Sequence, residues 1–283
     1  MAEYHLPPSG IERSVGSLPF PTAYEPESPP YFLSWLADLS ARILLNRVNN
    51  SMYNKPGLHV TSPGDILTDA ENHSNIQLQR PMLRVPLELN RQLQDWLGHL
   101  PSSIRPDTGG SDRREMYKVI LKLRYHATGE IIFRPFLFQA LSLPPEATIG
   151  SDTLHNCKTC ILHCRSYVKV VHERVSTPSA QTEIVLHRYA FTLDSPTSRE
   201  TYELCTEAEH SDAFSTLAAT LIMTLCSLSS HTKHLVPDVD DIQEQAIGLV
   251  RQWAWPRSSV ESMLSLLLTM RDKCRTVYAF ESP

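Results

Sequence analysis

Glycine is scarce in this chain, with 10 among 283 residues, whereas there are 21 prolines. Few glycines exclude a fold built from tight β-hairpins or glycine-rich phosphate loops. The sequence contains none of the patterns GxGxxG, GxxxxGK[ST], GxSxG and HExxH. HERVS at His172 lacks the second histidine with which a helix clamps a metal. We therefore predict a protein that is not an enzyme, and we assign no catalytic or cofactor-binding residues.

Long apolar runs and a targeting signal are also missing. The N-terminus has no apolar signal region, and the longest apolar run, Ala213–Leu228, is too short to span a bilayer. Six cysteines without regular spacing predict reduced thiols inside the cell. The formal net charge of -5 supplies no excess of basic residues for nucleic-acid binding. We expect no membrane association.

Apolar residues recur at helical spacing through most of the chain. Residues 1–30 are rich in proline and predict a linker or tail, and residues 31–280 predict one helical domain. No segment alternates as a strand does, although residues 177–210 show no clear pattern. The fold class predicted is all-α, a single irregular bundle of about eight helices.

Several helix boundaries follow from proline and capping residues. Pro29 and Pro30 suit the first turn of a helix that continues to Tyr53, and Pro86 is expected to start the next. Pro135 should break or kink the helix that begins after Asp112. Ser151 or Asp152 should cap the helix that carries most of the cysteines. The apolar run Ala213–Leu228 predicts a buried helix. Ser258 and Glu261 match a capping box ahead of the last helix.

The stretch HNCKTCILHCRSY, residues 155–167, contains three cysteines and two histidines. On a helix, Cys157, Cys160 and Cys164 fall within roughly 60° of one another, on the face that also carries Ile161, Val168 and Val171. Cysteine serves there as a small buried hydrophobe. His155 and His163 lie off this stripe, and no second CxxC or HxxxH supplies the remaining ligands of a zinc site. We therefore predict no metal site.

Two polar groups in the central helix have alternative interpretations. Arg113, Arg114, Lys118, Lys122 and Arg124 form a stretch that could contact phosphates, but a solvated helix face is the prediction because acidic residues interrupt it. Glu130 is expected to pair with Arg134 one turn later. A ligand-sensing carboxylate is the alternative.

Five segments in order resemble the regulatory region of fungal zinc-cluster transcription factors. They are YFLSWLADLSARILLNRVNNSMY, LELNRQLQDWLGHLPSSIRP, LKLRYHATGEIIFRPFLFQAL, CKTCILHCRSYVKVVHER and LVPDVDDIQEQAIGLVRQWA. The third is the most recognisable, and its match is carried by Tyr125, Arg134, Pro135, Phe136 and Leu137. The likeness covers about residues 31–275. The segment 192–212 and the pair Gly129–Glu130 depart from the family's apolar pattern.

The resemblance implies a nuclear domain that regulates transcription, binding protein partners such as related transcription factors or co-regulators, and a small-molecule effector. Members carry an N-terminal six-cysteine zinc cluster that binds DNA, whereas the first cysteine here is Cys157. The expected role is therefore that of a regulatory region without the DNA-binding zinc cluster, and we expect no specific DNA binding. Three explanations stay open: a start assigned too far downstream, a split gene, or a protein that acts without the cluster.

Two other interpretations stay open. One is a helical enzyme with its site in a cavity between helices, for which the first candidates are Tyr125, His126, Glu130 and Arg134. The other is a truncated gene product without an independent role. The sequence identifies neither target genes nor an oligomeric state.

Overall fold

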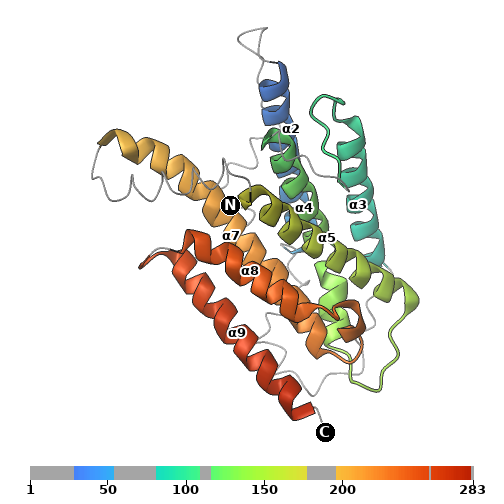
Figure 1. Cartoon of the computed structure of the whole chain (residues 1–283). Coiled ribbons are helices and arrows are strands. Elements are labelled where there is room, and N and C mark those ends of the chain that lie inside the picture. The colour runs from blue at the N-terminus through green and yellow to red at the C-terminus, as the bar shows by residue number, and fades with distance from the viewer. Residues whose placement is uncertain (1–28, 54–80, 109–115, 177–195, 255, 282–283) are drawn as a thin grey trace. The chain divides into compact units, whose positions relative to one another are not determined.

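The computed structural model describes residues 29–53, 81–108, 116–176, 196–254 and 256–281 (Figure 1). These residues contain no strand, and the predicted all-α fold class is confirmed. They form seven α-helices and one short 3₁₀-helix, against about eight helices expected. The predicted tail, residues 1–30, lies outside the described part except for its last two prolines.

The helices belong to two compact units. Residues 1–108 and 115–132 make up the first, and residues 109–114 and 133–283 the second. The first contains α2 (Pro29–Met52), α3 (Pro81–His99) and most of α4 (Met116–Leu141). The second contains the end of α4, then α5 (Ser151–Val175), α7 (Pro196–Leu228), η3 (Lys233–Leu235), α8 (Val239–Trp253) and α9 (Ser259–Glu281). The single domain over residues 31–280 stays a prediction.

In the first unit, α2 packs against α3 around a small apolar core. Leu121 and Ile104 are almost fully buried, and Leu33, Trp96 and Leu97 cover them. The Trp96 indole donates a hydrogen bond of 2.9 Å to the Ser40 hydroxyl, so the tryptophan is held at both its apolar and its polar end.

Charged side chains make further hydrogen bonds and an ion pair within this unit. The Arg105 guanidinium donates to the carbonyls of Gly98 and Leu100, which α3 leaves without helical partners at its C-terminus. Asp38 of α2 accepts from Arg124 of α4 at 2.8 Å. The Asp38 side chain is partly buried, and although that burial opposes ionisation, Arg124 and Arg42 lower the pKa of its carboxyl below the usual value.

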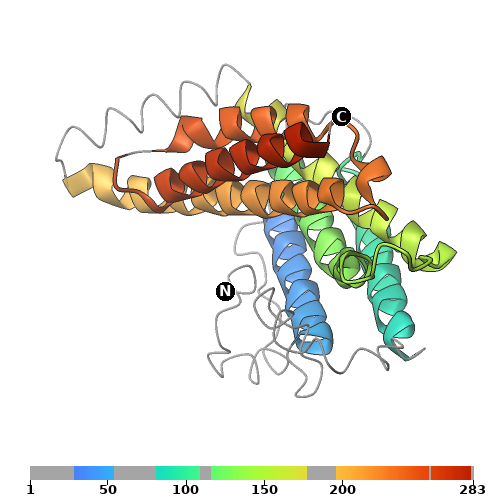
Figure 2. The same ribbon diagram turned by 90° about the horizontal axis from the view of Figure 1, so that it is seen from below.

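In the second unit, α7, α8 and α9 run alongside one another, and α7 also packs against α5 (Figures 1 and 2). The predicted inner face of α8, formed by Ile242, Ala246, Leu249 and Trp253, is buried as expected. The predicted helix Ala213–Leu228 is confirmed but begins earlier, at Pro196, within the stretch that showed no clear pattern. Leu221 and Leu228 are exposed, so this helix is not buried on every side.

Two predicted boundaries need correction. α3 begins at Pro81 and contains Pro86 within its second turn, so Pro86 does not start it. Gly150, not Ser151 or Asp152, is the N-cap of α5, and no side chain caps it. At α9 the prediction holds, since the Ser258 hydroxyl accepts from the Glu261 N–H at 3.1 Å. The Glu261 carboxylate also accepts from the N–H of Arg257, whose φ is 69°.

Pro135 does not break α4, which continues to Leu141. A proline has no N–H, so the carbonyl of Ile131, four residues earlier, loses its helical partner. The Tyr53 hydroxyl, just beyond the end of α2, donates to this carbonyl at 2.7 Å. The tyrosine therefore supplies the hydrogen bond that the proline removes.

This compensation predicts a coupled pair of substitutions. Y53F should lower the free energy of unfolding by about 1–2 kcal/mol, because it leaves the Ile131 carbonyl without a donor. In a P135A background residue 135 regains its N–H, so Y53F should then cost less than about 0.5 kcal/mol. Urea unfolding of the four proteins measures the coupling. Equal costs of Y53F in both backgrounds would contradict this account.

Candidate functional site

The predicted inward stripe of α5 is confirmed. Cys157, Cys160 and Cys164 are each 0% exposed, and Ile161, Val168 and Val171 on the same face are also buried. The Cys157 thiol lies 3.5 Å from the Phe136 carbonyl oxygen of α4, to which it donates. The five cysteines that the structure describes are free thiols.

A fourth buried thiol belongs to α7, the helix that packs against α5. Cys226 of α7 is also 0% exposed and interacts electrostatically with Cys160 and Cys157. Burial raises the pKa of the Cys226 thiol, and burial together with Cys160 raises that of Cys157 to about 12. Both are therefore neutral thiols at pH 7. The position of Cys226 in the sequence, 62 residues after Cys164, gives no signal that α7 packs on the cysteine helix.

The antiparallel packing of α5 and α7 explains why Cys226 arrives there. At the other end of the pair, the Arg174 guanidinium of α5 forms an ion pair with the Asp212 carboxylate of α7. The Tyr167 hydroxyl donates to the same carboxylate at 3.3 Å. Arg165 holds the start of α8 in a similar way, with bonds to Asp238 and to the Leu235 carbonyl. These partly buried ion pairs define which turns of the helices meet.

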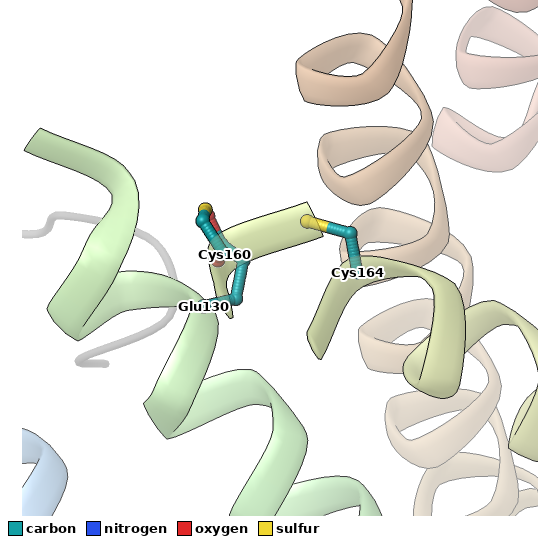
Figure 3. A group of neighbouring side chains, drawn as sticks. All are labelled: Glu130, Cys160 and Cys164. Carbon is teal, nitrogen blue, oxygen red and sulfur yellow. The ribbon is translucent and has the colours of Figure 1, made fainter. Parts of the chain in front are cut away.

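Figure 3 shows Cys160 and Cys164 on successive turns of α5, together with Glu130 of α4. The sulfur atoms of the two cysteines lie within 4.8 Å of each other. Both cysteines belong to the second unit, and Glu130 belongs to the first. The two thiols thus form one close pair within a single helix.

The two histidines of the cysteine stretch differ. His155 is exposed, whereas His163 is buried and stacks on Phe133 with ring centroids 6.2 Å apart. His163 is therefore buried, although it lies off the stripe of cysteines. Burial lowers the pKa of its imidazole to about 4, so the ring is neutral at pH 7.

The four residues suggested for a helical enzyme all lie on α4. His126, Glu130 and Arg134 follow one another at intervals of four residues and share a face. The Tyr125 ring contacts the edge of the His126 ring, with centroids 5.1 Å apart. The Tyr125 hydroxyl accepts from the Gln94 amide at 2.9 Å. His126 and Glu130 are buried. The Glu130–Arg134 ion pair stays a prediction.

The predicted solvated basic face of α4 needs correction. Lys122 is only 4% exposed, and Arg124 is held by Asp38. Arg113 and Arg114 lie outside the described residues. Helix packing therefore uses two of these cations, and the remaining basic residue described, Lys118, is half-buried. Within the described residues this segment presents no continuous basic surface for phosphates.

A second set of buried polar groups lies where α7, α8 and α9 meet. The Gln243 amide of α8 donates to the Thr224 hydroxyl of α7 at 3.0 Å. It also hydrogen-bonds the Cys274 thiol of α9, although burial has the larger effect and raises the pKa of that thiol. Thr216 and Thr220 extend this polar stripe along α7. The set links three helices through side-chain hydrogen bonds.

Together these features define an all-helical protein with a buried thiol cluster. No helix in the described part of the chain is long and apolar enough to cross a membrane. No protein-family model, no curated protein and no solved structure matches the chain.

The buried His163 predicts an acid-sensitive fold. In the unfolded chain its pKa is near 6.5, so between that pH and about 4 the unfolded state binds a proton that the folded state does not. Protonation of His163 in the unfolded state should lower the free energy of unfolding by up to about 3 kcal/mol as the pH falls through this range. In urea unfolding, H163Q should weaken the pH dependence by nearly one proton, whereas H155Q, at the exposed position, should leave it unchanged. An identical pH dependence in both variants would contradict the assignment.

Proposed function

We propose that this chain is a nuclear, non-enzymatic regulatory domain in transcription, of the kind found in fungal zinc-cluster transcription factors. The proposal is carried by the five resembling segments, which occur in the family's order. Each coincides largely with one described helix: α2, α3, α4, α5 and α8 in turn. The function would consist of binding related transcription factors or co-regulators, with a small-molecule effector as a second class of ligand.

Contacts between these segments support the proposal. Trp96 of the second segment bonds Ser40 of the first, and Tyr53 of the first bonds the Ile131 carbonyl of the third. Arg165 of the fourth bonds Asp238 of the fifth. Residues of the resembling segments thus help to join helices to one another. A common helical architecture gives a physical reason for such a likeness.

The chemistry of the thiols also favours binding over catalysis. A nucleophilic cysteine needs a thiolate and access to its substrate. The thiols of Cys157 and Cys226 are fully buried, and both have raised pKa values. A helical body of this kind acts by shifting between packed states when a ligand prefers one of them.

A tethering experiment tests the regulatory role. The chain, fused to an unrelated DNA-binding domain in a fungal host, should change transcription of a reporter severalfold relative to that domain alone. L137D should abolish the change, because it places a charge in the core. K158A, at an exposed position on α5, is the matched control and should keep it. The proposal would be refuted if the reporter signal were the same with the fused chain as with the DNA-binding domain alone.

The chain by itself should not bind DNA selectively. Its net charge is -5, and two of the basic residues of α4 are committed to packing. In a mobility-shift assay at physiological salt, we expect no sequence-selective complex with a randomised duplex pool. Enrichment of a defined sequence by the full chain would contradict this expectation.

A further inference from the structure

The side chain of Gln243 is enclosed where α7, α8 and α9 of the second unit run alongside one another (Figure 2). Gln243 is 1% exposed, and its amide nitrogen donates to the Thr224 hydroxyl of α7 at 3.0 Å. The amide oxygen is buried as well, and no donor among the described residues reaches it. A buried acceptor of this kind is rare in folded proteins, because it has lost its contact with water and gained nothing in return.

Turning the Gln243 amide by 180° does not satisfy both of its polar atoms. In the turned orientation the amide oxygen accepts from the Thr224 hydroxyl, and the amide nitrogen takes the place that has no partner. Either orientation therefore leaves one amide atom of an enclosed glutamine unsatisfied. The group that satisfies it must donate to an amide oxygen or accept from an amide nitrogen.

The Thr224 hydroxyl offers a second hydrogen-bonding group beside this amide. Two neighbouring hydroxyls of α7 donate to carbonyls of their own helix, Thr220 to Thr216 at 2.7 Å and Ser227 to Thr224 at 2.7 Å. In the part of the chain that the structure describes, the Thr224 hydroxyl acts only as an acceptor, from the Gln243 amide. Its hydrogen is therefore available for a further acceptor.

The side chains next to Gln243 limit the chemical class of the missing group. α7 contributes Thr224, and Ala246 lies one turn further along α8, so the neighbouring side chains are small. A buried Mg²⁺ or Ca²⁺ ion would need about six oxygen ligands, whereas Gln243 and Thr224 supply two oxygen atoms. A water molecule is small and neutral, and it both donates and accepts hydrogen bonds.

We propose that this junction binds one water molecule, which donates a hydrogen bond to the Gln243 amide oxygen and accepts one from the Thr224 hydroxyl. Buried waters make about two to four hydrogen bonds, to polar groups that the protein itself leaves unsatisfied. The water becomes part of the contact between α7 and α8. The site goes beyond the proposed role in transcription, and either can fail without the other.

Oxygen-17 relaxation dispersion of the solvent tests the site, because it counts the water molecules that stay inside a protein for longer than the protein tumbles. Hydroxyl groups do not contribute, since their oxygen atoms do not exchange with water. The full chain is compared with Q243M, which keeps the length of the side chain and removes both amide atoms. The wild type should hold one long-lived water molecule more than Q243M. T232V is the matched control and should equal the wild type, because Thr232 is fully buried and its hydroxyl already donates to the Cys226 carbonyl at 2.9 Å.

A crystal structure of the wild-type chain is a second measurement that does not depend on whether Q243M folds. It should show one water molecule within about 3.2 Å of both the Gln243 amide and the Thr224 hydroxyl. The proposal is overturned if a folded Q243M holds as many long-lived waters as the wild type, if T232V loses as many as Q243M, or if protein atoms fill the space beside the amide in the crystal.

Discussion

The fold depends on the burial of the inner face of α5 by other helices. This face consists of thiols, valines and an isoleucine, and transferring these apolar side chains out of water stabilises the folded state. α7 covers this face in the second unit, and α8 packs on both helices. The ion pairs of α5 with Asp212 and Asp238 follow from that packing arrangement, whereas Cys157 and His163 also contact α4.

Apolar packing alone does not determine which turns of two helices meet, because neighbouring turns of an apolar face offer similar contacts. The pairs Arg174–Asp212 and Arg165–Asp238 supply that discrimination, since a shift by one turn would leave a partly buried charge unpaired. In the first unit, Asp38 with Arg124 and Tyr53 with the Ile131 carbonyl do the same. Both units therefore combine a nonspecific apolar core with a few directional polar contacts.

Helical periodicity predicted the all-α fold, the buried face of α5 and the buried face of α8, because a repeat near 3.6 residues is a local property. Local signals were less reliable where proline was concerned. Pro135 does not break α4, which continues to Leu141, and Tyr53 from just beyond α2 bonds the carbonyl that the proline leaves. Pro86 lies inside α3 instead of at its start. At α9, in contrast, the Ser258 hydroxyl accepts from the Glu261 N–H as the capping box predicts.

The sequence by itself determined which side chains share a face of each helix, since that depends only on the angle between successive residues. It placed Cys157, Cys160 and Cys164 on one stripe. It did not determine that α7 would pack on that stripe, that His163 would be buried, or that Lys122 would leave solvent. Those outcomes depend on which helices pack together and in which register, and this is decided by contacts between residues far apart in the chain.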